Sequence, residues 1–215
     1  MARSRTEAPP PRRRYAKRLL PADRREQLLD TALRIVTTAG FAEVTIAAVA
    51  EHGGVTRPVV YDSFGNRDEL LAALIERETS RMRAAVGRAL LAEPESGTRA
   101  REVLLAALGR FLSDVRTMPG TWRLVYFPID GVPPLLRDHI RKARNEFRVP
   151  LRQLLGDWLA GRPPGERADE VDLDVFVELV QGCLQTLSRR VLDDPEQFGV
   201  ERIIAAIDLM LGELP

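Results

Sequence analysis

The sequence is poor in the side chains that catalysis and metal binding most often use. Its 215 residues include one cysteine, Cys183, and two histidines, His52 and His139. One cysteine excludes an intramolecular disulfide and a Cys-x-x-Cys metal site. Neither histidine lies in a nucleophile, metal-binding or acid–base motif, and there is no Gly-x-Gly-x-x-Gly or phosphate-binding loop. We therefore expect no catalytic residue, no metal site and no cofactor, with a small α-helical enzyme as the remaining alternative.

Long apolar runs are also missing. No segment approaches the ~20 apolar residues that a membrane-spanning helix needs. The basic first residues are not followed by the apolar core of a signal peptide. We therefore expect a cytoplasmic protein with no membrane partner. Because 45% of the residues are hydrophobic, the chain can bury one substantial core and a small satellite domain.

Charge is nearly balanced overall but unevenly distributed. The chain carries a formal +1, whereas residues 1–20 hold seven basic residues against one glutamate, or +6, so the remainder is near −5. Residues 22–67 hold five arginines and six acidic residues and lack the positive footprint expected for phosphate binding. Three prolines at positions 9, 10 and 11 oppose a regular helix. The basic segment fits either an arm that lies in a minor groove of DNA or a disordered solubilising tail.

Apolar residues recur at helical spacing along the chain, and no strand pattern competes. The first helix is expected over residues 22–39, with Asp23 and Glu26 as a capping box and Gly40 just past its end. Asn66 and Glu69 repeat the capping-box pattern before a long helix. The fold class is therefore all-α.

Four further helices are expected over residues 98–115, 135–160, 168–192 and 195–211. Pro150 lies inside the second of these. It removes a ladder hydrogen bond and clashes with the preceding turn, so we expect a kink or a broken helix near residues 146–149.

The stretch from Thr45 to Phe64 predicts two short helices joined by a glycine turn. Thr45 can cap the first helix, and Gly53 and Gly54 end it. Thr56 can cap the second helix. The pattern is typical of a helix-turn-helix, and it also fits any helical hairpin.

In a helix-turn-helix, the first residues of the second helix meet base edges in the major groove. Here those residues are Arg57, Pro58 and Val59. The guanidinium of Arg57 can bind O6 and N7 of guanine, and Pro58 and Val59 offer apolar surface to a thymine methyl.

The segment from Gln27 to Leu71 resembles the DNA-binding domain of TetR-type one-component transcriptional repressors. The resemblance rests on the first helix ending in Gly40-Phe41, the Thr45 start, the Ala50 and Gly54-Val55 turn, the Tyr61-x-x-Phe64 pair and the run Arg67-Asp68-Glu69-Leu70. It implies a basic, disordered arm over residues 1–21 and a three-helix DNA-binding domain over 22–67. A helical ligand-binding and dimerisation domain would cover 68–215.

The resemblance also implies two sets of DNA-contacting residues. Phosphate contacts would come from Thr45, Tyr61 and Arg67, and the groove would be faced by Arg57, Pro58, Val59, Asp62 and Ser63. Thr56, next to Arg57, is counted with them, whereas Phe41 and Phe64 would be core.

Three of these positions have a second interpretation. The carboxylate of Asp62 would be repelled by phosphate, although it can accept a hydrogen bond from cytosine N4. Tyr61 also fits a half-buried core aromatic. Arg67 also fits a solvated charge at a helix start.

The central and C-terminal helices suggest a ligand pocket and a subunit interface. Candidate pocket residues are the large apolar side chains and polar groups of the central helices: Trp122, Tyr126, Phe127, His139, Phe147, Trp158 and Gln181. The helices expected at 168–192 and 195–211 have apolar faces too wide for burial by one small domain, which predicts a homodimer. Burial of those faces within one chain is the alternative.

We therefore expect a regulator that binds double-stranded DNA. A dimer would place two reading helices about 34 to 36 Å apart on a palindromic operator. By resemblance, a small-molecule effector would release the repressor. An effector-independent or architectural DNA-binding protein is the alternative.

Overall fold

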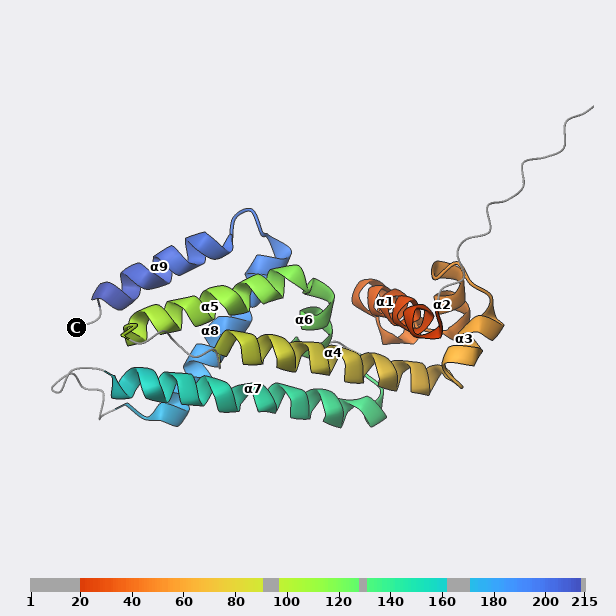
Figure 1. Cartoon of the computed structure of the whole chain (residues 1–215), viewed down its shortest axis with the longest axis horizontal. Helices are drawn as coiled ribbons and strands as arrows, with labels where there is room; N and C mark the ends of the chain where they lie inside the picture. Colours follow the sequence, from red (N-terminus) through yellow and green to blue (C-terminus); the bar gives the residue numbers. More distant parts are fainter. Residues whose placement is uncertain (1–19, 91–96, 128–130, 162–170, 214–215) are drawn as a thin grey trace, which may run out of the picture.

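The computed structural model describes residues 20–90, 97–127, 131–161 and 171–213, and regular structure in these ranges is entirely helical (Figure 1). None of these helices is long and apolar enough to cross a membrane. In chain order the elements are α1 (Pro21–Ala39), η1 (Phe41–Glu43), α2 (Ile46–His52), α3 (Arg57–Ser63), α4 (Arg67–Leu90), α5 (Ala100–Thr117), α6 (Pro119–Val125), α7 (Pro134–Ala160), α8 (Leu173–Asp193) and α9 (Val200–Glu213).

Helices α1 to α3 form a compact head at one end of the molecule (Figure 1). Its core is made by apolar side chains from α1, η1, α2 and α3, among them Leu28, Phe41, Val49, Val60 and Phe64, all of them nearly inaccessible to solvent. Gly40 has φ of +91°, a conformation that glycine adopts without strain, and its N–H donates to Val36 O. The chain therefore turns at the predicted position after α1.

Two of the four predicted helix starts are capped by the predicted N-cap side chain, although the Glu69 carboxylate accepts from Gly65 and not from Asn66 as a capping box would. The Thr45 hydroxyl accepts the N–H of Ala48 at 3.0 Å. At the start of α4, Asn66 Oδ1 accepts the N–H of Glu69 at 2.9 Å, and Glu69 Oε2 accepts the N–H of Gly65 at 3.1 Å. These caps satisfy backbone donors that a helix leaves free at its first turn.

The other two predictions of caps are wrong. Thr56 occupies the N-cap position of α3, but its side chain makes no capping hydrogen bond. Helix α1 begins at Pro21, and no side chain caps it. The Glu26 carboxylate instead pairs with Arg77 of α4, at 2.9 Å from Nη1. Both helices have a proline in their first turn, and in α1 the Glu26 side chain is occupied by its ion pair with Arg77.

Helix α4 connects the head to a body made of α5 to α9 (Figure 1). It packs against α5, α6 and α7 along its length. Helix α6 is short and lies between α4 and the head, where it also packs against α1. The body is completed by α8 against α5 and α7, and by α9 against α5. The head therefore meets the body through α4 and α6.

Several boundaries differ from those expected. Helix α5 begins and ends two residues later than predicted, and α9 begins at Val200, after a turn in which Asp194 Oδ1 accepts the N–H of Gln197 at 3.1 Å. Helix α8 begins at Leu173, where Asp172 caps it by accepting the N–H groups of Asp174 and Val175. The predicted start at residue 168 lies outside the described residues.

Helix α7 runs through Pro150 without interruption, so the predicted break does not occur. Proline leaves the carbonyl of Glu146 without its helical N–H partner. Buried side chains on both sides of the proline, Phe147, Leu151 and Leu155, keep the two halves of the helix packed against the body. Tertiary packing therefore outweighs the local cost of the proline.

We expect Pro150→Ala to raise the free energy of unfolding by about 1 to 3 kcal/mol, because it restores a backbone donor and a favourable helix residue. The measurement is urea unfolding followed by circular dichroism. Val149→Ala is the matched control, since Val149 is 70% exposed on the same helix. A Pro150→Ala protein no more stable than this control would show that the proline costs α7 nothing.

Candidate nucleic-acid interface and internal cavity

The short helix α3 presents most of its surface to solvent. Of its seven residues only Val60 is buried. Arg57, Pro58, Tyr61 and Asp62 are exposed, with Tyr61 leaving 53% of its surface accessible. The other two residues predicted to face the groove, Val59 and Ser63, are partly buried. The structure therefore brings these side chains together on one outer surface of the head.

The two threonines predicted to contact DNA lie at the starts of α2 and α3. Thr45 accepts a backbone N–H with its oxygen, and its own hydroxyl proton is still available for donation. Thr56 is exposed and makes no capping bond. A hydroxyl at the start of a helix lies beside free backbone N–H groups, an arrangement suited to a phosphate oxygen.

Arg67 has a different environment from the other predicted phosphate contacts. Its Nε donates to Val44 O and its Nη2 donates to Phe41 O, both at 2.6 Å. These bonds tie the first turn of α4 to the segment between η1 and α2. The solvated charge considered as an alternative for Arg67 is therefore wrong, because the guanidinium is committed to two carbonyls inside the head.

Two further α1 side chains hold the helix-turn-helix, and sequence reasoning missed both. Arg25 Nη1 donates to Ser63 O at 2.6 Å, and its guanidinium lies 4.2 Å from the centre of the Phe64 ring. Gln27 Nε2 donates to Gly53 O at 3.2 Å. The partners lie 38 and 26 residues apart in the sequence, so no local pattern marks them.

Arg25, Gln27 and Arg67 act as carbonyl anchors of the head. The last carbonyls of a helix have no partner within the helix. Ser63 is the last residue of α3, and Gly53 is the C-cap of α2. Arg25 and Gln27 therefore hold the two short helices by the ends that lack internal hydrogen bonds, whereas Arg67 holds the segment that precedes α2.

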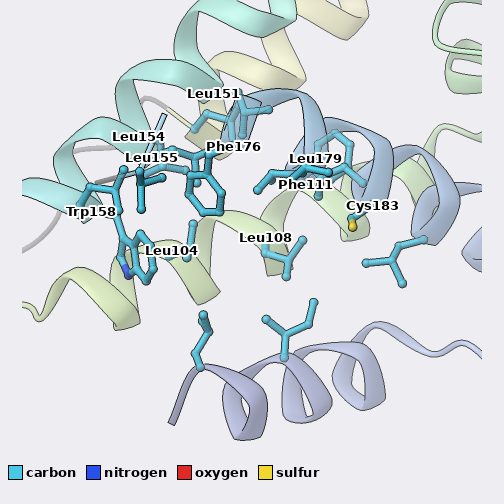
Figure 2. Close-up of a pocket in the computed structure, with 18 residues that line it drawn as sticks. Leu104, Leu108, Phe111, Leu151, Leu154, Leu155, Trp158, Phe176, Leu179 and Cys183 are labelled. Carbon is cyan, nitrogen blue, oxygen red and sulfur yellow. The ribbon is translucent and has the colours of Figure 1, made fainter. Parts of the chain in front are cut away.

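The body contains a cavity of about 430 Å³ between α4, α5, α7, α8 and α9, and its wall includes Leu179 of α8, which is 64% exposed (Figure 2). Its described lining is almost entirely aliphatic and aromatic, with leucines from every one of these helices and Phe111, Trp158 and Phe176 as the rings. No charged side chain is among the described residues that line it. Such a cavity suits the hydrocarbon part of a small molecule.

Of the seven residues predicted to line a ligand pocket, only Trp158 lies on this cavity. The other six do not line it. His139 is exposed on α7, and Gln181 is partly buried on α8 outside the cavity. The remaining four, Trp122, Tyr126, Phe127 and Phe147, are buried core side chains.

These aromatic side chains pack with Phe111 in one cluster. The ring centres of Phe111 and Trp122 lie 5.0 Å apart and those of Tyr126 and Phe147 lie 5.5 Å apart, both pairs edge to face. Burial raises the pKa of the Tyr126 hydroxyl, so this side chain stays neutral. The spacing of apolar residues in the sequence could identify the large apolar side chains. It could not show whether they face the core or the cavity.

Helices α8 and α9 leave an apolar surface uncovered in the single chain. Val175, Leu179, Leu209 and Met210 are more than half exposed. A groove of about 740 Å³ runs between the two helices and is lined by Leu179, Leu187, Phe198, Ile203 and Met210, among others. An apolar surface of this kind is typical of a protein interface.

Comparisons with known proteins agree with this arrangement of head and body. Residues 28–74 match the family described as "Bacterial regulatory proteins, tetR family". The chain is 24% identical over 206 residues to the HTH-type transcriptional regulator EthR of Mycolicibacterium smegmatis, covering 92% of this chain and 88% of that protein. A TetR-like transcriptional regulator from Rhodococcus sp. RHA1 aligns with a TM-score of 0.66 and 25% identity over 89% of this chain and 94% of that one.

One solved structure of the same fold contains a ligand. It is the transcriptional regulator FadR from Bacillus subtilis in complex with stearoyl-CoA, with a TM-score of 0.63. The identity is 13%, and the alignment covers 88% of this chain and 98% of that one.

We expect Arg25→Ala to cost about 1 kcal/mol of stability, because it removes a hydrogen bond to Ser63 and a cation–π contact with Phe64. Amide exchange of residues 57–64 should rise more than that of the α4 core. Arg34→Ala is the control, since Arg34 is exposed and its side chain bonds to Thr31 of its own helix. Equal exchange of α3 in the two variants would contradict the role of Arg25 as an anchor.

Proposed function

We propose that this chain, whose residues 28–74 match the tetR family, works as a homodimeric transcriptional repressor released from a palindromic operator by an apolar small molecule. The observation that carries the proposal is the outward row of side chains on α3. A seven-residue helix that buries one side chain contributes little to the core. Its other side chains are free to contact a partner.

The exposed residues of α3 divide by chemistry into base readers and phosphate contacts. Arg57 reaches guanine O6 and N7, and Pro58 and Val59 meet a thymine methyl. Tyr61, Thr45 and Thr56 donate hydroxyl protons to phosphates and fix the register. Ser63 and Asp62 face the groove farther along the helix, where Asp62 selects for cytosine and disfavours other bases.

We propose that Arg67 contributes to DNA binding chiefly by fixing Thr45. Its bonds to Phe41 O and Val44 O hold the segment that presents the Thr45 hydroxyl. Its Nη1, which lies 4.0 Å from Asp68, is left to approach a phosphate. The basic residues before position 20 would supply the positive charge that residues 22–67 lack.

A homodimer would cover the exposed surface of α8 and α9. Leu179 and Met210, at 64% and 67% exposure, are among the exposed apolar side chains that a second copy would bury. Pairing of the same two helices about a twofold axis gives a four-helix arrangement. The axis would place the two heads one DNA turn apart, about 34 to 36 Å.

We propose that the effector places a hydrocarbon group in the internal cavity. The lining offers apolar contacts and no charged partner among the described residues, so a charged head group would stay outside it. The acyl-CoA in FadR, a protein of the same fold, is consistent with this class. Filling the cavity would favour a body shape that holds the heads away from operator spacing.

The first experiment is selection of bound duplexes from a random pool. On the selected duplex, Arg57→Ala should weaken binding by about 1 to 3 kcal/mol and relax the preference at one base pair. Tyr61→Phe, which removes only a hydroxyl, should weaken binding to all duplexes alike. Equal losses on every sequence for both variants would exclude Arg57 as a base reader and favour an architectural protein.

Leu179→Glu should convert the dimer to a monomer, because it places two charges in a desolvated interface. Analytical ultracentrifugation measures the change, and operator binding should fall with it. Leu135→Glu is the control, since Leu135 is equally exposed, at 70%, on α7. A Leu179→Glu protein that stays dimeric would place the interface elsewhere.

A further inference from the structure

A buried ionic cluster lies where the head meets the body. Glu78 of α4 has no exposed side-chain surface. Its Oε1 accepts from Arg77 Nε at 2.7 Å and from Arg81 Nη1 at 3.2 Å, and its Oε2 accepts the Thr121 hydroxyl of α6 at 2.5 Å. A buried carboxylate is costly unless all its partners stay in place. The geometry of α4 and α6 is therefore tied to these bonds.

Arg77 extends the same cluster to the head. Its Nη1 lies 2.9 Å from Glu26 Oε2 and 2.9 Å from Asp30 Oδ1, both on α1. Burial by itself would lower the pKa of Arg77, but the carboxylates of Glu78, Glu26 and Asp30 raise it, so the guanidinium is charged. Three helices, α1, α4 and α6, thus share one network of charges.

Helix α6 joins this network to the wall of the cavity. Thr121 is followed by Trp122, whose ring packs edge to face on Phe111 at 5.0 Å. Phe111 also lines the cavity. At the other end of α6, Arg144 of α7 donates to Val125 O and Phe127 O, both at 2.6 Å. The helix is therefore held at both ends and contacts the cavity wall in between.

A direct contact between α6 and α1 adds to this link. A Cβ placed on Gly120 would lie 3.0 Å from Leu33 Cδ2, so the Leu33 side chain of α1 packs directly on α6 at this glycine. A displacement of α6 would therefore push on α1 as well as on Glu78.

We propose that Glu78, bridging Thr121 and Arg77, is the positioning residue that links occupancy of the cavity to the placement of the reading head. The proposal rests on the proposed function. A molecule in the cavity moves Phe111, and Trp122 carries the movement along α6. The Thr121 hydroxyl then leaves Glu78, whose buried oxygen loses its partner. The cluster rearranges, and α1 shifts with the reading helix attached to it.

The test replaces the effector by side chains that fill the cavity. Leu108→Trp and Leu154→Trp add a ring from two walls, on α5 and α7, and neither residue lines the groove between α8 and α9. Amide exchange of residues 22–39 reports the placement of α1 without DNA. We expect each filler to raise exchange of the protected α1 amides at least tenfold and to weaken binding to the selected duplex at least tenfold.

The link itself is tested in the background of Thr121 variants. Thr121→Val removes the hydroxyl at nearly constant volume, and Thr121→Ser keeps it. Thr121→Val alone should raise α1 exchange, and in its background the fillers should add less than twofold. Thr121→Ser should retain the tenfold response, which a purely structural role of the side chain would not require. Glu78→Gln should resemble Thr121→Val.

Glu146→Gln is the matched control. It removes another ion pair of α4, with Arg83 at 2.6 Å, that reaches α7 and not the head. Responses of Thr121→Val and Glu78→Gln equal to those of Glu146→Gln, or fillers that leave α1 exchange unchanged, would overturn the link. If the wild-type chain binds no duplex, the proposed function fails, whereas the exchange measurement still decides whether the cavity and α1 are coupled.

Discussion

The structure depends on holding a helix that is too short to be stable alone. Helix α3 has seven residues and buries one of them, and isolated helices of this length do not form in water. A reading helix must nevertheless keep its outer face free of the core. The solution in this chain is to fix α3 from behind, through Val60 and Phe64 in the core and through donors from α1 and α4 to the free carbonyls of the head.

In the proposed coupling, helix α1 is the element through which the body would act on this arrangement. Three successive residues of α1 contact three different elements: Arg25 bonds to the end of α3, Glu26 pairs with Arg77 of α4, and Gln27 bonds to the turn after α2. Any change in the angle between α1 and α4 is therefore passed to both short helices at once. The buried Glu78 lies next to Arg77 on α4, so in the proposed coupling sensing and reading would share one mechanical support.

The helices of the head could be predicted from contacts between residues close in the sequence. The contacts between distant residues could not. The Thr45 cap, the Gly40 turn and the Asn66–Glu69 cap each involve residues within a few positions of one another, so the sequence could specify them. Arg25 and the Glu26–Arg77 pair depend on helices brought together by folding. The lining of the cavity could not be predicted for the same reason. Helical spacing defines an apolar face, but Phe147 and Trp158 of the same helix face the core and the cavity respectively.

The most direct test of the account is the ratio of dissociation constants for the selected duplex and for a shuffled duplex of the same composition, measured at physiological salt. Base reading by α3 predicts a preference of roughly a thousandfold or more for the selected duplex. Equal binding of the two duplexes, or binding of neither, would contradict the assignment of α3 as a reading helix.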